Sequence, residues 1–188
     1  MKLEDIITVK IGRNLSRGKG KNDLTLVVYS YEDLMNDLDG SFLDSKASSY
    51  SGNSNHRDGY LSRSGDVIFS FVSSKAGIVS DLNQGKIINQ NFAKLTIEHD
   101  HLDRNYLCYT LNESYSIKKQ MAISMQGSIV PKLTPAILKK LEINLPSIEK
   151  QRTIGKAYLS LRKRQALAKK EAQLEEKLYL EILKQLDQ

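Results

Sequence analysis

The residues best suited to chemistry lie in one short polar segment, His99-Asp100-His101, with Asp103 two positions further on. Imidazole and carboxylate groups together are ligands that bind divalent transition metals. The alternative is a solvated polar turn that holds no ion. These residue types favour the turn, so no metal site is predicted. The lone cysteine, Cys108, lies in an apolar stretch and is interpreted as a packed thiol rather than a nucleophile.

Motifs of catalysis on DNA do not occur in the sequence. A methyltransferase acting on DNA amines would carry an Asp/Asn-Pro-Pro-Tyr/Phe step, and none of the three prolines stands in one. The Glu-x-Lys step of metal-dependent nucleases occurs only at 175–177, inside a predicted helix and therefore misplaced. The Gly-Lys-Ser/Thr ending of a nucleoside-triphosphate loop is also missing. The sequence predicts a protein without catalysis or a cofactor.

A basic, glycine-containing run extends from Lys10 to Lys21 and contains five bases, with no acid between Asp5 and Asp23. Such a run suits contacts to phosphates, because glycine allows close approach of the backbone. An ordinary solvated basic loop is the alternative. The Ser- and Asn-rich segment from Ser41 to Tyr60 is predicted to be a long surface loop, with side chains of the types that read base edges.

Strands and short helices must position these segments. The β-branched and aromatic residues at 24–31, 67–72, 78–79, 86–97 and 141–145 predict strands, and the alternation at 3–11 is looser. Short helices are predicted at 32–38, at 102–121 as one or two helices, and from Thr134-Pro135 to about residue 140.

A long helix is predicted from Ser147 to Gln188, since no Pro follows Pro146 and no Gly follows Gly155. Its ladder of four-three steps contains Ile154, Tyr158, Leu161, Ala168, Ala172, Tyr179, Ile182 and Leu186, with the polar residues Gln165 and Glu175 at two further steps. Leu167, Leu174 and Leu178 form a flanking row. This pattern is typical of a coiled-coil seam, and at about 1.5 Å per residue the helix would run roughly 60 Å. The alternative is an amphipathic helix that folds back on its own domain.

Composition sets the remaining limits. A chain of 188 residues with 40% hydrophobic residues allows one domain plus this helix, but not two ordinary domains. The net charge of +6 leans toward a polyanionic partner. One cysteine excludes an internal disulfide, and Met1 to Thr8 lacks the apolar run of a signal peptide, so a cytoplasmic protein is expected.

In this order the features resemble a known family. The resemblance is carried by the entry at 3–12, the steps at 63–70, 105–111 and 127–128, and most sharply the segment 138–154, in which a strand ends at Pro146 and an acid and Gln151 precede the long helix. The chain thus resembles the DNA specificity subunits of type I restriction-modification systems, in a half-subunit form. Members typically have two target-recognition domains, each followed by a helix, and the two helices pair antiparallel.

The resemblance implies an α+β target-recognition domain at residues 1–146, with a small mixed or antiparallel sheet, and a coiled-coil-forming spacer helix at 147–188. Predicted contacts to double-stranded DNA are Arg13, Arg17, Lys19, Lys21, Asn55, Arg57, Tyr60, Ser73, Lys75 and Lys86. Predicted dimerisation residues are Ile154, Tyr158, Leu161, Ala168, Tyr179, Ile182 and Leu186. The implied partners are a second copy, a methyltransferase (modification) subunit and, in systems that cleave DNA, a restriction motor. A rival hypothesis is a coiled-coil adaptor or inhibitor that binds a methyltransferase subunit without reading DNA.

Overall fold

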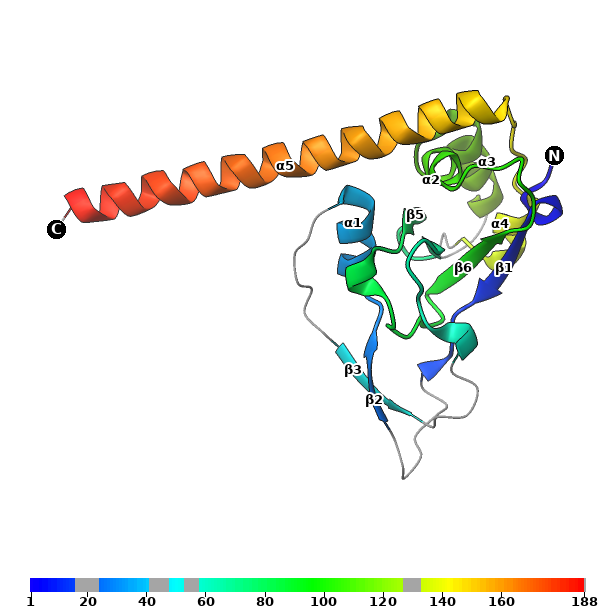
Figure 1. The fold of residues 1–188 in the computed structure, drawn as a ribbon, viewed down its shortest axis with the longest axis horizontal. Coiled ribbons are helices and arrows are strands. Elements are labelled where there is room, and N and C mark those ends of the chain that lie inside the picture. The colour runs from blue at the N-terminus through cyan, green and yellow to red at the C-terminus, as the bar shows by residue number, and fades with distance from the viewer. Residues whose placement is uncertain (16–23, 41–47, 53–57, 127–132, 188) are drawn as a thin grey trace.

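The computed structural model describes residues 1–15, 24–40, 48–52, 58–126 and 133–187 (Figure 1). Its strands are β1 (Ile7–Ile11), β2 (Leu24–Val28), β3 (Ser48–Gly52), β4 (Val67–Ser70), β5 (Lys75–Ile78) and β6 (Phe92–Ile97). Its helices are α1 (Tyr31–Asp39), α2 (Arg104–Glu113), α3 (Tyr115–Met125), α4 (Pro135–Lys140) and α5 (Ile148–Leu186). The predicted α+β class with a long C-terminal helix is confirmed.

A four-stranded antiparallel sheet in the order β1-β6-β4-β5 forms the centre of the globular part. Strands β2 and β3 form a separate antiparallel ribbon. Ile87 joins this ribbon to the rest of the domain, because its N–H donates to the carbonyl of Val27 at 2.8 Å and its carbonyl accepts from the N–H of Tyr29 at 2.9 Å.

The sheet is buried on both faces, as alternate side chains of β4 show. Val67 and Phe69 belong to the larger core cluster, which includes residues of α2, α3 and α4. Ile68 points to the opposite face and joins a smaller cluster with Leu34 of α1 and Tyr29. Because successive side chains of a strand point to opposite faces, this single strand contributes to both cores.

Local signals explain where the short helices begin and end. Ser30 and Asp33 form a reciprocal capping box at the start of α1, and Gly40 ends this helix in the left-handed region at φ 59°. The Thr134 hydroxyl accepts a hydrogen bond from the N–H of Ile137, so the predicted start of α4 is confirmed. The predicted helical region 102–121 contains two helices, which meet at Ser114.

Several predicted elements differ from those observed. The prediction of a closing strand at 141–145 is wrong. These residues make only an isolated bridge, between Lys2 and Glu142, because a 3-10 turn at Leu3–Asp5 interrupts the N-terminal segment that would pair with them. Residues 48–52 of the predicted long loop form β3, and the loop's other residues up to 57 lie outside the described ones. Strand β2 stops at Val28 because Ser30 begins a helix.

Helix α5 has 39 residues and begins after Ser147, whose hydroxyl accepts from the N–H of Lys150. Its first half lies against α2 and α1, and its second half extends beyond the globule (Figure 1). Within the described part of the chain, no helix has the length and apolar character needed to cross a membrane.

Candidate nucleic-acid interface and the surface of α5

One edge of the sheet collects polar residues from three separate segments. Strands β1 and β4 end there, and β5 and β6 begin there. We call this the polar edge and define it as Arg13, Asn89–Asn91 and Ser73–Lys75. The N–H of Arg13 donates to the carbonyl of Ile88 at 2.8 Å, and the N–H of Phe71 donates to the carbonyl of Asn91 at 2.9 Å, so backbone bonds hold the segments together.

Gly12 brings two of these segments into direct contact. A Cβ atom at this position would lie 2.1 Å from the carbonyl oxygen of Asn89, which no side chain could accommodate. The Asn89 side chain in turn accepts a hydrogen bond from the N–H of Asn91 at 2.8 Å. The polar edge is therefore a fixed backbone arrangement, in which a glycine is required.

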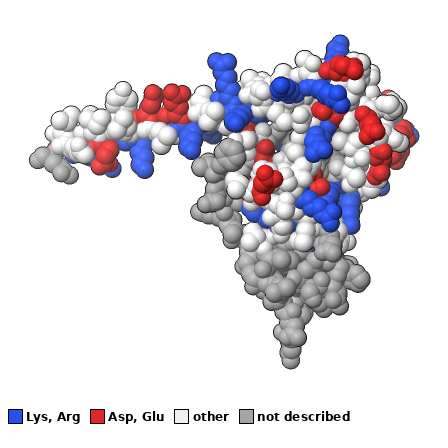
Figure 2. Space-filling model, viewed as in Figure 1, with Lys and Arg blue, Asp and Glu red and all other residues white. Residues whose placement is uncertain are grey.

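Lys10 and Tyr60 extend the polar edge toward β1. The Lys10 ammonium lies 5.0 Å from the centre of the Tyr60 ring, which is a cation–π arrangement. Lys94, directly across from Lys10 in the sheet, pairs with Asp66 at 2.5 Å. Among the described residues no carboxylate pairs with Lys10 or Arg13. Figure 2 shows Lys and Arg side chains at several places on this face of the globule and along α5, interspersed with Asp and Glu.

The structure separates the predicted DNA contacts into three groups. Arg13 and Tyr60 lie at or beside the polar edge, partly exposed. Arg17, Lys19, Lys21, Asn55 and Arg57 lie outside the described residues. The side chains of Lys75 and Lys86 form ion pairs within the domain, and the Ser73 hydroxyl is buried.

Lys86 forms an ion pair within the domain. Its ammonium lies 2.7 Å from the Asp33 carboxylate, and the two side chains are only 16% and 2% exposed. The same residue's N–H donates to the Ser62 hydroxyl at 3.0 Å. Lys86 therefore fixes the segment before Ile87 to α1, and this ion pair competes with the phosphate contact predicted for Lys86.

Lys75 and Ser73 are constrained in a similar way. The Lys75 ammonium contacts the Glu113 carboxylate and the Asn112 carbonyl, both at 3.3 Å, at the end of α2. The Ser73 hydroxyl is buried, so it is not exposed to read a base edge. The backbone of this turn remains at the polar edge, and a contact of either side chain to DNA stays a prediction.

Residues in the first half of α5 attach the helix to the domain. The buried Gln151 side chain accepts from the N–H of Asp103 at 3.0 Å and donates to the carbonyls of His101 and Pro146, both at 2.8 Å. Gly155 lies so close to α2 that a Cβ atom would be 2.5 Å from the nitrogen of Tyr106. Two further attachments, Tyr158 and Arg162, follow on the same side of the helix.

Tyr158, which was predicted to face a partner, lies against α2 of its own domain. It is 7% exposed and packs edge-on against Tyr109 of α2 at 5.7 Å. Burial raises its pKa to about 12. Ile154 likewise packs against the larger core. Arg162 bonds the Asp39 carboxylate of α1 from Nε at 2.9 Å, so α5 contacts two helices of its own domain.

Beyond these attachments α5 presents apolar side chains that the domain does not cover. The exposed large residues on it are Leu161, Leu167, Leu174, Leu178, Tyr179, Leu180, Ile182, Leu183 and Leu186. Ala168 is also exposed. The alternative of a helix folded back on its domain therefore describes only its first half, up to about Ala166.

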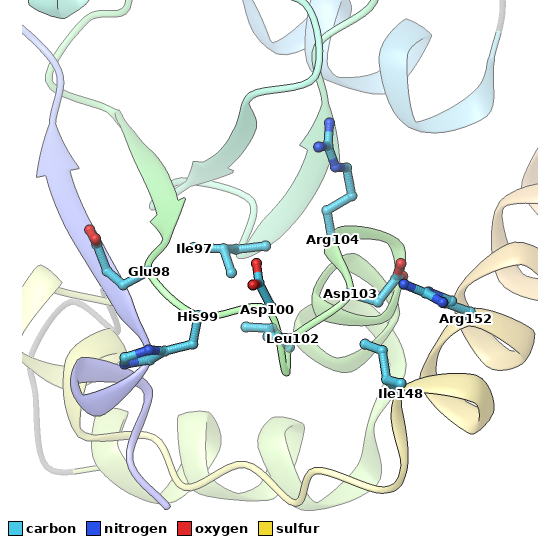
Figure 3. A pocket seen from close by; sticks show the side chains of 9 residues that line it. All are labelled: Ile97, Glu98, His99, Asp100, Leu102, Asp103, Arg104, Ile148 and Arg152. Atoms are coloured by element: carbon cyan, nitrogen blue, oxygen red, sulfur yellow. The ribbon is translucent and has the colours of Figure 1, made fainter.

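A polar pocket lies where α5 begins, and Figure 3 shows the nine side chains that line it. The Asp103 carboxylate caps α2, accepting from the N–H groups of Asn105 and Tyr106 at 2.9 Å each. His99 points away from both Asp100 and Asp103. Among the described residues no group of three His, Cys, Asp or Glu could hold a metal, so the arrangement gives no support to the metal alternative.

A model of a known protein family matches nearly the whole chain. The family model described as type I restriction modification DNA specificity domain matches residues 1–187. The chain belongs to this family. The specificity subunit of the type I restriction enzyme MjaVIII from Methanocaldococcus jannaschii is 24% identical over 127 residues, which cover 64% of this chain and 30% of that protein.

Solved structures of specificity subunits share the fold. The HsdS subunit from Thermoanaerobacter tengcongensis matches with a TM-score of 0.58 and 22% identity, covering 92% of this chain and 39% of its own. A chain from a study of complex assembly and conformational transition in a type I R-M system matches with a TM-score of 0.60 and 21% identity, covering 97% of this chain and 42% of its own. The chain thus spans less than half the length of these relatives.

Two features of the candidate site were not predicted from residue types. Lys10 was included only as the start of a basic run, and its position over Tyr60 depends on a contact between distant segments. Asn89 and Asn91 belong to a short polar segment that interrupts an apolar, strand-like run. This interruption was the signal in the sequence that could have indicated the polar edge.

Proposed function

We propose that this chain is a DNA-recognition half of a type I specificity subunit. Its globular part, residues 1–146, reads a short DNA sequence, and the helix at 147–188 joins two such parts. The observation that carries the proposal is the family match over residues 1–187 together with a polar edge that leaves Lys10 and Arg13 without acidic partners among the described residues. The match covers 30% to 42% of the length of these relatives.

In this proposal, phosphates are bound by Lys10, Arg13 and the basic residues that follow to Lys21. Phosphate contacts fix the position of a protein on the duplex, whereas contacts to base edges supply specificity. Tyr60 and the amide side chains of Asn89 and Asn91 are the described residues best placed beside such contacts.

The chain is proposed to act without catalysis of its own, in the cytoplasm. A separate methyltransferase subunit supplies methyl transfer, and a restriction motor supplies cleavage where the system cleaves DNA. The isolated protein is expected to bind no S-adenosylmethionine and to leave DNA unmodified. Calorimetry that detected micromolar binding of this donor to the protein alone would contradict this part of the proposal.

DNA binding is tested by titrating duplex DNA of mixed sequence at several salt concentrations. Each phosphate contact contributes about 0.9 to the slope of log affinity against log salt, so Lys10→Ala and Arg13→Ala should each reduce that slope by about one. Lys119→Ala, an exposed lysine on α3, serves as the control and should leave the slope unchanged. No duplex binding at low salt, even with a methyltransferase subunit present, would favour the adaptor hypothesis.

Dimerisation through α5 is the second part of the proposal. It is supported by the exposed Leu161 and Ile182, which are 52% and 42% accessible in the single chain. Leu161→Glu with Ile182→Glu would place charges in the apolar contact, which costs several kcal/mol when they are unpaired. Light scattering should then report a folded monomer. A double variant that stays dimeric would place the interface elsewhere.

A further inference from the structure

The exposed ladder of α5 has a symmetry that the proposed dimer does not by itself require. Its central positions are Leu161, Gln165, Ala168, Ala172, Glu175 and Tyr179, all exposed in the single chain. These positions lie in pairs at equal distances on either side of Lys170. Ala168 and Ala172 are two positions from it, Gln165 and Glu175 five, and Leu161 and Tyr179 nine. The two polar residues of the ladder thus stand at equal distances from one point.

This symmetry selects one arrangement of two helices. The seam positions of a coiled coil alternate between two types, a and d. In an antiparallel pair an a position of one helix faces a d position of the other, and each of the three pairs above combines one a and one d position. Moving one helix by a heptad would keep the seam but would face Gln165 and Glu175 with apolar residues. A parallel pair would face Glu175 with its own copy and bring two like charges together.

For the proposed dimer, whose antiparallel pairing the family resemblance implies, we propose that the two-fold axis lies level with Lys170 and that the Gln165 amide donates a hydrogen bond to the partner's Glu175. This register rests on the proposed dimer and specifies it. In the described chain Gln165 and Glu175 have no hydrogen bond or ion pair of their own. A hydrogen bond to a carboxylate is stronger than one between neutral groups, and a single polar layer can fix register.

The domain's own contacts limit the seam. Tyr158 and Ile154 continue the ladder in the sequence, but the domain covers much of both, so Leu161 is the first ladder residue that is exposed in the single chain. Small residues at 168 and 172 allow the two backbones to approach closely at the axis. Gly155, where the domain is attached, lies fifteen positions from Lys170.

This register sets the distance between the two domains. At 1.5 Å per residue the two attachment points lie about 45 Å apart along the helix pair. With a rise of 3.4 Å per base pair, that separation corresponds to about 13 base pairs between the attachment points.

A charge exchange tests the register. Gln165→Glu would place two carboxylates against each other in both symmetric layers and should raise the dimer Kd at least about tenfold. Adding Glu175→Gln to that variant exchanges the two groups and should restore the Kd to within about threefold, because donor and acceptor are paired again. Gln173→Glu makes the same chemical change off the seam and should leave the Kd unchanged. Sedimentation equilibrium measures all four proteins.

Cross-linking gives an independent result. Ala168→Cys with Ala172→Cys should form disulfides between copies on oxidation, whereas Ala168→Cys alone should cross-link poorly. The native Cys108 does not compete, because it is buried and burial raises its pKa to about 12. A dimer in which the exchange fails to restore the Kd, or in which Ala168→Cys alone cross-links readily, would overturn the register. A wild-type protein that is monomeric at every concentration would overturn the proposed dimer itself.

Discussion

Replacement of Gln151 tests how α5 is attached to the domain. The side chain is 1% exposed and makes three hydrogen bonds to backbone groups of two segments. Gln151→Ala would leave one N–H and two carbonyls without these partners in a buried site. At about 1 kcal/mol net for each bond, the free energy of unfolding should fall by about 3 kcal/mol.

Urea denaturation followed by circular dichroism measures this loss, and thermal melting should show a decrease of roughly 6–12 °C for a domain of this size. Amide exchange should rise first at residues 101–103 and in the first turns of α5, because these groups lose their bonds. The neighbouring Arg152→Ala is a matched control, since Arg152 is exposed and should change stability by less than about 0.5 kcal/mol. A loss below about 1 kcal/mol for Gln151→Ala would refute the reasoning.

Three other outcomes are expected. Lys86→Met removes the partner of the buried Asp33 carboxylate and should cost about 3–5 kcal/mol in urea denaturation, and a cost under 1 kcal/mol would mean that the pair is not needed for folding. Cys108 should not react with Ellman's reagent at pH 8 in the native protein and should react fully in denaturant, because burial raises its pKa to about 12; rapid native reaction would contradict its packing. One heptad inserted after Gln165 should lengthen the helix pair by about 10 Å and the preferred DNA spacer by roughly three base pairs, measured by selection from randomised DNA. An unchanged spacer would mean that the helix does not set the distance.

The sequence predicted elements best where a local signal decides the structure. Thr134-Pro135 and Ser147 begin helices because a hydroxyl can cap the free N–H groups of the first turn, a contact within three residues. The long helix followed from its periodicity and the lack of Gly and Pro. The segment 141–145 has a strand's alternation, but whether it pairs depends on the N-terminal residues that lie beside it, and no local pattern contains that information.

The candidate site was harder to predict for the same reason. Lys86 and Lys75 looked like free bases, and only the fold reveals that Asp33 and Glu113 lie within ion-pair distance. Tyr158 fits the four-three ladder as well as Leu161 does. The sequence cannot distinguish a seam that faces a partner from one that faces the chain's own α2, because both require an apolar residue at the same spacing.

Strand β6 separates the polar edge from the site where α5 is attached. Its first residue, Phe92, stands at the polar edge, and its last, Ile97, lines the pocket where α5 is attached, about 17 Å away along the strand. Loops at the polar edge could therefore be exchanged or lengthened without altering the groups that hold α5. Substitutions at Arg13, Asn89 and Asn91 would leave the attachment of α5 unchanged, so in the proposed function a new specificity could arise while the assembly remains the same.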